Sequence, residues 1–446
     1  MQEPNQPTLS GNSRSYFHLD LSWKISYYDL LFLVLFVIDT ILRFVWLDKP
    51  TGSLIFDEWY YVNVARVILG LPQSVGANGK VAYPNAQIGL DPNHEHPPLA
   101  KLLIALSTWI FGNNGYGWRI PSVIFGCVAI LVFYLLMKKI TKDQYPVLPL
   151  LATFLFSFDN LAYVHSRIAT LDIFALAFLL LGAYWYFDAL DSTHYTLYTC
   201  LSALSMALGS LTKITGVAGY LLIVGIQLVK FLSDRDAGLN WDRFFSWLEK
   251  YTAVFLVSFF VLLGIMDRFW VGYAWPWEHV AYILKYSAEL TSGCPNGIIA
   301  CPWQWLANQI LIPYLRVTVT TTTNGVSTSY FSYNFLGQMN PAIVYLTIFA
   351  VLYCSYSYWQ RRDDLSLFVI ALFAVTYLPF YPATIFDQRV TYLFYFLQAI
   401  PAVCAGIAYM IVDTKLPKWV ILVYLAVVLY AFAQMFPFAL THGFPS

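Results

Sequence analysis

Long apolar stretches alternate with short polar segments along almost the whole chain. Each apolar stretch is about twenty residues long, which is the length of helix that crosses the hydrocarbon of a bilayer. Backbone polar groups inside lipid must be hydrogen-bonded within their own segment, so these stretches predict membrane-spanning helices. The pattern predicts eleven spans, at approximately 27–47, 120–138, 146–164, 171–189, 195–212, 215–232, 251–269, 340–359, 365–381, 390–412 and 418–438.

Lysine and arginine in the short connections predict the orientation of the spans, because cytoplasmic loops are enriched in both. The basic residues of the N-terminus and of four connections fall on one side: Arg14 and Lys24, Lys138-Lys139 with Lys142, Arg235 to Lys250, Arg361-Arg362, and Lys415 with Lys418. We therefore expect a cytoplasmic N-terminal tail over 1–26 and an external C-terminal tail over 441–446. These opposite locations agree with an odd number of spans.

Two long connections, 48–119 and 270–339, are expected on the external side. The apolar segment 99–111 inside the first is too short to cross the bilayer. It is expected to lie in the membrane interface or to re-enter it. The second connection carries a threonine-rich run, Thr318 and 320–323, which favours either a β-strand or a flexible loop.

Composition supports a membrane protein. Charged residues make up 11% of the 446, against about 25% in soluble domains. The hydrophobic fraction is 59% and the mean hydropathy is +0.60, which predicts a polytopic integral membrane protein. The first apolar run is too long for the core of a cleavable signal peptide and predicts a retained anchor. The formal net charge is +0 and no basic block occurs, so nothing indicates a nucleic-acid partner.

Two of the six cysteines share an external connection. Cys294 and Cys301 stand in the sequence Cys-Pro-Asn-Gly-Ile-Ile-Ala-Cys. Because the external side permits disulfides, this pair is a disulfide candidate. The remaining cysteines fall in predicted spans and are expected to be inert packing thiols: Cys127, Cys200, Cys354 and Cys404.

Two consecutive acids, Asp57 and Glu58, follow the first predicted span. They lie where the chain leaves the bilayer, so their carboxylates can be ionised and still reach a lipid-borne substrate. One carboxylate is enough for a general base, while its neighbour positions it or binds a cation. The alternative is a pair of acids favoured at a helix start by the helix dipole.

Other ionisable residues gather at the external ends of the predicted spans. They come from distant parts of the sequence but share one membrane depth: Arg66, His94, Glu95, His96, Lys101, Arg119, Arg167, Asp172, Lys213 and Arg389. Guanidinium and ammonium groups at this depth suit a phosphate whose lipid tail remains in the bilayer. Three alternatives stay open: snorkelling side chains, a structural salt bridge between Arg167 and Asp172, and zinc binding by His94 and His96.

Familiar nucleotide-binding signatures are absent from the sequence. There is no Gly-x-x-x-x-Gly-Lys loop and no Gly-x-Gly-x-x-Gly after a predicted strand. Asp234-Arg235-Asp236 has the Asp-x-Asp form of a nucleotide-sugar metal site. It lies in a predicted cytoplasmic connection, so we do not assign it that role.

Several of these motifs occur in an order that resembles one family. Phe56-Asp57-Glu58-Trp59-Tyr60, His96-Pro97-Pro98-Leu99-Ala100-Lys101 and Trp118-Arg119-Ile120-Pro121 are followed by Ser166-Arg167 through Asp172, Lys213 to Gly216, Asn340-Pro341 and Arg389. This order resembles that of the protein O-mannosyltransferases, multi-span enzymes of the GT-C glycosyltransferase class that use dolichyl-phosphate-mannose. The resemblance covers about residues 27–440.

The chain also departs from that family pattern. The family's Gly in the His-Pro-Pro-Leu-Gly-Lys motif is Ala100 here. A Tyr-His-Tyr-Leu-Pro motif is replaced by the sequence from Tyr395 to Pro401, which lacks histidine. The soluble β-trefoil domain of fungal members is missing from 270–339. These departures fit a compact prokaryotic-type member and leave open whether the acceptor is a protein, a lipid or a lipid-linked glycan.

The resemblance implies an all-α polytopic GT-C fold with a transmembrane catalytic domain over 27–440 and its active site on the external side of the plasma membrane. It implies transfer of a hexose, with mannose expected, from a polyprenyl- or dolichyl-phosphate carrier to Ser or Thr hydroxyls of secreted or membrane proteins, with inversion. A secondary transporter is the competing class, although no inverted repeat is apparent.

The resemblance also implies roles for residues. Asp57 and Glu58 are catalytic, with Asp57 as the base. The donor phosphate is held by Arg119, Lys213, Arg167 and Arg389. The substrate is positioned by His96, Lys101, Asp172, Trp59 and Tyr60. No obligatory metal or other cofactor is expected, with a divalent cation at Asp57, Glu58 or His96 as the alternative.

Overall fold

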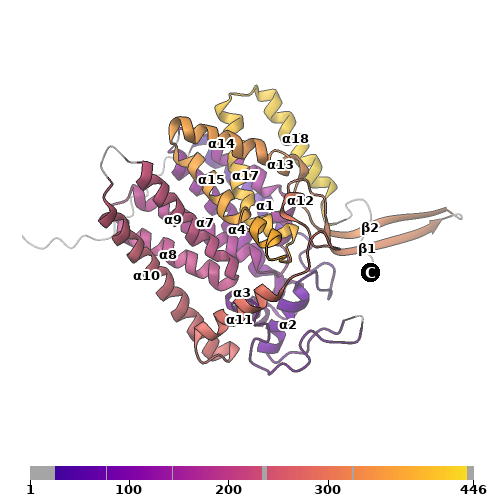
Figure 1. The fold of residues 1–446 in the computed structure, drawn as a ribbon. Helices are drawn as coiled ribbons and strands as arrows, with labels where there is room; N and C mark the ends of the chain where they lie inside the picture. Colours follow the sequence, from indigo (N-terminus) through magenta and orange to yellow (C-terminus); the bar gives the residue numbers. More distant parts are fainter. Residues whose placement is uncertain (1–25, 77, 143, 234–238, 324–325, 439–446) are drawn as a thin grey trace, which may run out of the picture.

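The computed structural model describes residues 26–76, 78–142, 144–233, 239–323 and 326–438. It is a helical body from which one long β-ribbon projects (Figure 1). The helices in the N-terminal half are α1 (Tyr27–Phe44), α2 (Glu58–Ile68), α3 (Leu99–Phe111), α4 (Gly115–Thr141), α5 (Leu148–Ser157), α6 (Asn160–His165), α7 (Asp172–Leu190), α8 (Tyr195–Thr212), η1 (Ile214–Gly216) and α9 (Val217–Ser233).

The second half contains the ribbon between two groups of helices. Its elements are α10 (Trp241–Met266), η2 (Asp267–Val271), α11 (Pro276–Glu289), α12 (Pro302–Trp305), β1 (Ile312–Thr323), β2 (Val326–Gly337), α13 (Pro341–Val344), α14 (Thr347–Arg361), α15 (Asp364–Tyr377), α16 (Phe380–Ile385), η3 (Leu393–Ala399), α17 (Ile400–Asp413) and α18 (Lys418–Gln434).

Every predicted span coincides with helical structure, but the predicted number of eleven spans is not confirmed. Among the described residues, seven helical segments are long and apolar enough to cross a membrane: Gly115–Thr141, Asp172–Leu190, Ile214–Ser233, Trp241–Val271, Pro341–Arg361, Asp364–Ile385 and Leu393–Asp413. The helices α5 and α18 are apolar but shorter. These segments support an integral membrane protein.

The predicted span at 146–164 is interrupted between α5 and α6. Asp159 ends the first helix and caps the second, because its carboxylate accepts a hydrogen bond from the Ala162 backbone N–H at 3.0 Å. Its other carboxylate oxygen accepts one from the Asn340 N–H at 2.9 Å. A buried acid that binds two backbone donors stabilises a break in the helix, and apolar patterning alone does not reveal it.

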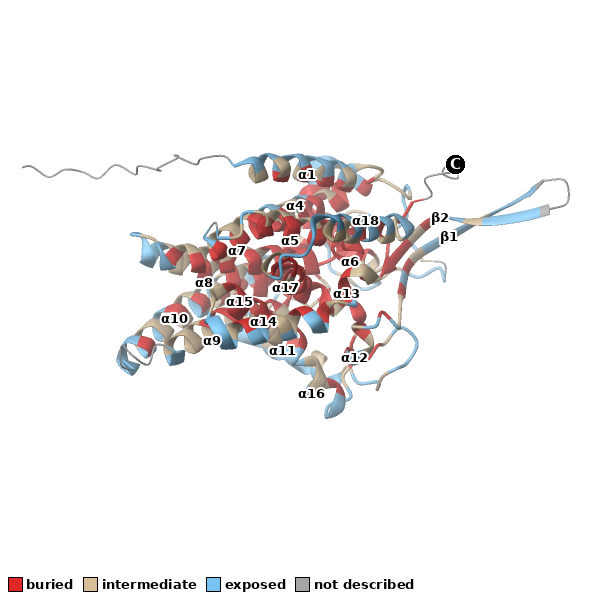
Figure 2. Cartoon of the chain, turned by 90° about the horizontal axis from the view of Figure 1, so that it is seen from above, coloured by how far each residue is buried: buried red, intermediate tan, exposed pale blue. Residues whose placement is uncertain are grey.

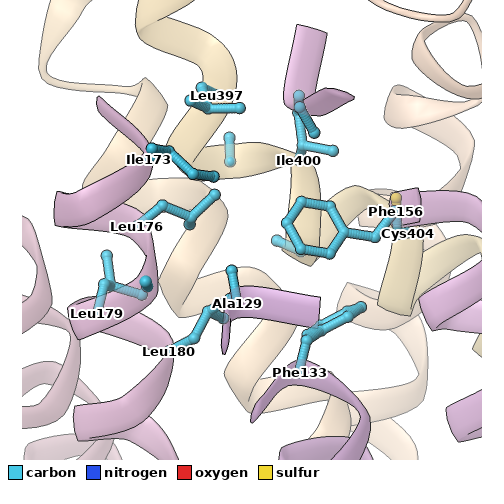
Figure 3. Packing of buried hydrophobic residues seen from close by; sticks show 14 of the residues in the cluster. Ala129, Phe133, Phe156, Ile173, Leu176, Leu179, Leu180, Leu397, Ile400 and Cys404 are labelled. Atoms are coloured by element: carbon cyan, nitrogen blue, oxygen red, sulfur yellow. The ribbon is translucent and has the colours of Figure 1, made fainter. Parts of the chain in front are cut away.

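The core lies where α4, α5, α7 and α17 meet. Figure 3 shows residues of these helices in one cluster, among them Phe133 of α4, Phe156 of α5, Leu176 of α7 and Ile400 of α17. Burial falls from this centre towards the outer helices α1 and α18 (Figure 2). The outer helices expose large apolar side chains such as Trp419 and Leu422, as expected where lipid covers a helix.

The ribbon is the one departure from an all-α chain among the described elements. The strands β1 and β2 pair antiparallel, from the Ile312–Gly337 pair to the Thr323–Val326 pair. The Thr-rich run is therefore a strand. At the base of the ribbon Tyr314 is buried, and its ring lies over Gly337, where an added Cβ would approach the ring to 2.6 Å. Glycine is thus required there for the ring to pack.

Candidate functional site

The two consecutive acids begin α2, and the residue before them has an unusual backbone. Phe56 has φ of 54°, a left-handed conformation that is rare and strained for an aromatic residue. Its ring stacks on Tyr314 with centroids 4.1 Å apart and meets Phe394 edge-on at 5.5 Å. These contacts hold the turn in place and send the next two side chains in different directions.

Glu58 points into the protein and is fully buried. Its two oxygens each accept a hydrogen bond of 2.8 Å from the Arg119 guanidinium. They also accept backbone N–H bonds from Ile55 at 2.8 Å and from Ala169 at 2.9 Å. A carboxylate with four donors has little capacity left for a substrate.

The guanidinium of Arg119 is equally occupied. Besides its bonds to Glu58, it donates to the carbonyl oxygens of Leu47 at 2.9 Å, Lys49 at 3.2 Å and Ser53 at 3.0 Å. All three nitrogens therefore have partners in the protein. The ion pair fastens the connection after α1 to the start of α4.

Two further cations that the sequence selects have the same character. Arg167 donates to the Leu42 carbonyl at 2.7 Å and to the Val45 carbonyl at 2.5 Å. The ammonium of Lys101, on α3, is fully buried and lies 2.6 Å from an Asp91 oxygen. It also donates to the carbonyls of Asn93 and His96, and so holds the segment before α3 in place.

Asp57 differs from Glu58 because its carboxylate has no hydrogen bond to another side chain or backbone group of the described residues. It lies outside the helices long enough to span a membrane. Burial raises the pKa of Asp57 to about 7; the Lys213 ammonium opposes this shift, while the carboxylates of Asp172 and Glu95 add to it. A carboxylate with a pKa near neutrality is suited to accept a proton.

Lys213, directly after α8, is the cation whose charge acts on Asp57. Its ammonium lies 2.6 Å from an Asp172 oxygen, and 5.1 Å and 5.3 Å from the ring centroids of Tyr395 and Phe394. Lys213 keeps only 6% of its surface exposed. One carboxylate partner leaves further donor capacity on the ammonium, which has three N–H groups.

Arg389 and His96 each present a buried nitrogen without a hydrogen-bond partner among the described residues, Nη1 and Nδ1 respectively. Burial lowers the pKa of His96 well below its ordinary value, and the charges of Lys213, Lys101 and Arg389 lower it further. The ring is therefore neutral. Buried donors are nearly always satisfied in proteins, so an unused pair in one site indicates places for ligand atoms.

The aromatic residues after the acids lie at the edge of the site. Trp59 is partly buried and packs on the turn at Gly76, where an added Cβ would lie 3.1 Å from its ring. Tyr60 is 47% exposed. Asp172 is bound to Lys213, so the two members of the predicted Arg167–Asp172 salt bridge have other partners.

Sequence reasoning missed two aromatic contributors, Tyr314 and Tyr395. Tyr314 reaches the site from β1, and its hydroxyl lies 2.8 Å from Nε2 of His165. Tyr395 flanks Lys213. Tyr314 carries no local signal, because it stands in a strand far from the acids in sequence. Tyr395 begins the segment that replaces the family's histidine-containing motif. This departure from the family pattern could have identified Tyr395 as a site residue.

Two other features bear on the site. No group of three or more His, Cys, Asp or Glu side chains in the described parts of the chain is arranged to hold a metal ion. Cys294 and Cys301 form a disulfide in the connection before the ribbon.

A cavity of about 680 Å³ lies elsewhere, at the ends of α8, α9 and α14, and is lined by residues such as Lys230, Arg243 and Tyr358 rather than by the site residues.

Comparison with known proteins places this geometry in context. A family model described as dolichyl-phosphate-mannose-protein mannosyltransferase matches residues 95–262. The chain is 25% identical over 429 residues to the polyprenol-phosphate-mannose–protein mannosyltransferase of Corynebacterium glutamicum. This match covers 82% of this chain and 79% of the relative. The chain is also 27% identical over 228 residues to an undecaprenyl phosphate-alpha-4-amino-4-deoxy-L-arabinose arabinosyl transferase of Pseudomonas aeruginosa. This match covers 48% of this chain and 39% of that relative.

A solved structure shares the fold. The Saccharomyces cerevisiae protein O-mannosyltransferase Pmt1–Pmt2 complex bound to the sugar donor superposes with a TM-score of 0.69 over 93% of this chain and 90% of that one, at 12% identity. The predicted GT-C fold is thereby confirmed. The chain therefore has the GT-C fold and is similar over most of its length to a polyprenol-phosphate-mannose–protein mannosyltransferase.

Proposed function

We propose that this enzyme transfers mannose from a polyprenyl-phosphate carrier to Ser or Thr hydroxyls of proteins, with inversion at the anomeric carbon. The observation that carries the proposal is the unpartnered carboxylate of Asp57, with a pKa of about 7, beside the Lys213 ammonium. The names of the mannosyltransferase relatives support the donor and the acceptor.

Asp57 acts as the base in this mechanism. It accepts the proton of the acceptor hydroxyl while the hydroxyl oxygen forms a bond to the anomeric carbon. The bond from that carbon to the lipid phosphate oxygen breaks, and the phosphate leaves from the opposite face with the bonding electrons. A base held in position typically contributes about 10²–10⁴-fold to the rate.

The leaving phosphate is held by Lys213 and Arg389. Both keep donor capacity that the protein does not use, and negative charge on the phosphate grows as the bond breaks. The neutral ring of His96 offers Nδ1 to a sugar hydroxyl. Glu58, Arg119, Arg167 and Lys101 are assigned a structural role in this scheme, because protein groups already occupy their polar atoms.

The same proposal includes location and domain organisation. The site belongs to a catalytic domain over 27–440 and faces the exterior of the plasma membrane, while the N-terminus is cytoplasmic. The distribution of Lys and Arg in the short connections supports this orientation. Lys213 lies directly after α8, and Arg389 lies in the connection between α16 and η3.

A lipid or lipid-linked glycan is the second candidate acceptor, and the similarity to the arabinosyl transferase favours it. One assay separates the two. The purified chain in liposomes is incubated with labelled polyprenyl-phosphate-mannose, a Ser/Thr-containing peptide and a lipid extract. Label on the peptide supports the proposal, and label in the lipid fraction alone overturns the protein acceptor. The Asp57→Asn variant controls for spontaneous transfer, and a chelator tests the divalent-cation alternative.

A further inference from the structure

Among the described residues, one strand edge of the ribbon has no backbone partner outside the ribbon. The outer edge of β2 is covered at its base, where the Asn334 N–H donates to the Pro437 carbonyl at 2.9 Å and Tyr333 bridges to Phe438. Within the described residues, the strand β1 makes no backbone hydrogen bond other than those to β2. Alternate N–H and C=O groups are therefore available along the outer part of β1, from Thr318 to Thr323.

The outer part of this edge, from Val317 to Thr323, lacks the usual protection against pairing with another chain. Natural edge strands are commonly blunted by charged side chains, by proline or by short length. The segment Val317–Thr323 contains neither a charged residue nor proline, and β1 has 12 residues. The two irregularities in the pairing of β1 lie in its inner half, between Pro313 and Leu315 and between Val317 and Thr318. An edge left open in this way suits a binding function better than a purely structural one.

Hydroxyl groups pair with one another across the projecting part of the ribbon. Thr320 with Ser329, Thr321 with Thr328 and Thr322 with Ser327 lie 2.8, 3.0 and 2.9 Å apart across the strands. These pairs satisfy the side chains within the ribbon. The backbone edge is then the main group that remains for recognition.

The same strand leads directly to the candidate site. Tyr314, three residues before Val317, stacks on Phe56, the residue next to Asp57. From Thr323 to Tyr314 a strand extends about 30 Å at about 3.3 Å per residue. A polypeptide paired with β1 would therefore run from the exposed end of the ribbon towards the proposed base.

We propose that the outer edge of β1 is the docking site of the acceptor polypeptide, which binds in an extended conformation by backbone pairing. This inference rests on the proposed function and specifies how that site takes its acceptor. Recognition through main-chain hydrogen bonds requires little of the acceptor sequence beyond its hydroxyl. It brings a Ser or Thr beside Asp57 while the rest of the acceptor lies along the ribbon.

The test uses two acceptor peptides of one sequence that differ only in which alternate backbone nitrogens carry a methyl group. Only every second N–H of a paired strand faces its partner, so one methylation pattern blocks pairing and the other does not. We expect one peptide to show a KM raised about tenfold or more, at unchanged kcat, and the other to match the unmethylated peptide. Equal KM values for all three peptides, or an equal loss with both patterns, would overturn the docking proposal.

A shortened chain provides the matched control. Replacing 319–330 by Asn-Gly closes a tight turn on the Thr318–Phe331 pair and keeps Tyr314 in place. This variant should lose the discrimination between the two methylated peptides but keep wild-type transfer to N-acetylthreonine amide. Discrimination that persists, or loss of transfer to the small acceptor, contradicts docking on this edge. A change in oligomeric state without a change in peptide KM instead assigns the edge to a second copy of the chain.

Failure of the proposed function gives a different result. If the wild-type chain transfers sugar to neither the peptides nor N-acetylthreonine amide, the acceptor assignment is wrong. Binding of the two fluorescent peptides to the wild-type and shortened chains, measured by anisotropy, then still decides the docking proposal. Weaker binding of one methylation pattern supports it, and equal binding of both overturns it.

Discussion

Two groups of charged side chains lie next to each other at the start of α2, and they differ in how many of their polar atoms have partners. In the first group, Glu58 and Arg119 bind each other and nearby backbone groups until no polar atom is unused. In the second group, the Asp57 carboxylate accepts no hydrogen bond from the described residues, and Arg389 keeps a buried nitrogen unpaired. Adjacent acids thus take opposite roles because the strained turn at Phe56 directs them to different surroundings.

This difference separates structural charges from reactive ones. Removing one member of a fully bonded buried pair leaves the other charge without compensation, which costs stability. Removing an unpartnered group changes few protein contacts and should act mainly on chemistry. The variants below test this distinction from both sides.

The largest effect is expected from Asp57→Asn. The amide cannot accept the proton of the hydroxyl, so turnover should fall about 10²–10⁴-fold. Donor binding and the thermal midpoint should remain near wild type, since the Asp57 carboxylate makes no hydrogen bond to the described residues. Turnover is measured with labelled donor and peptide, and binding by donor titration. Donor affinity that falls in parallel with turnover would give Asp57 a binding role instead.

The matched substitution one residue later should act on stability. Glu58→Gln leaves the buried Arg119 guanidinium without a counter-charge, and breaking such pairs costs about 3–5 kcal/mol. We expect a clearly lowered unfolding midpoint in detergent, while Asp57→Asn keeps that of the wild type. An unchanged midpoint for Glu58→Gln, accompanied by lost turnover, would assign Glu58 to catalysis.

Arg389→Gln should weaken the binding of the donor. A hydrogen bond to a charged group contributes about 1.5–3 kcal/mol, so the dissociation constant for the lipid phosphate should rise about 10–100-fold. Arg362→Gln is the control, because Arg362 lies over the Tyr358 ring in a different part of the structure. Equal effects of the two substitutions would indicate a general loss of positive charge rather than a phosphate site.

The pH dependence should report the raised pKa of Asp57. A base works only when deprotonated, so kcat/KM should rise with pH, reach a plateau above about 7, and lie about tenfold below the plateau at one pH unit under that value. The residual activity of Asp57→Asn should lack this limb. An acidic limb near the ordinary carboxyl pKa would show that burial does not shift Asp57.

Tyr314→Phe is expected to have the smallest effect. The ring can still stack on Phe56, and only the hydrogen bond to His165 is lost. One neutral hydrogen bond contributes about 0.5–1.5 kcal/mol, so turnover should change by less than about tenfold. Tyr314→Ala removes the stacking as well and should lower turnover further. Equal turnover of the two variants would mean that the stack does not hold the Asp57 turn.

The sequence predicted the helical positions well, because lipid imposes one length and one polarity on every span. It did not reveal the break at Asp159, which depends on a hydrogen bond to Asn340 from a distant part of the chain. It also selected the charged residues that converge, since charge is costly near lipid. Their pairing, such as Lys213 with Asp172 rather than Arg167, follows from tertiary geometry that no local pattern encodes.

The division between Asp57 and Glu58 has the same origin. Both are acids at one helix start, and nothing in their local sequence separates them. Their difference comes from Arg119 in α4 and from the Ala169 N–H, both distant in sequence. The Thr-rich run was open between strand and loop because its partner strand and the buried Tyr314 at its base become visible only in the fold.

A structure of the chain with polyprenyl-phosphate-mannose bound would test the account most directly. We predict that the phosphate lies within hydrogen-bonding distance of Arg389 and Lys213, with the anomeric carbon turned towards Asp57 and the Glu58–Arg119 pair unchanged. A phosphate bound by Arg119 or Arg167 instead, with the Glu58 ion pair broken, would contradict the division between structural and reactive charges.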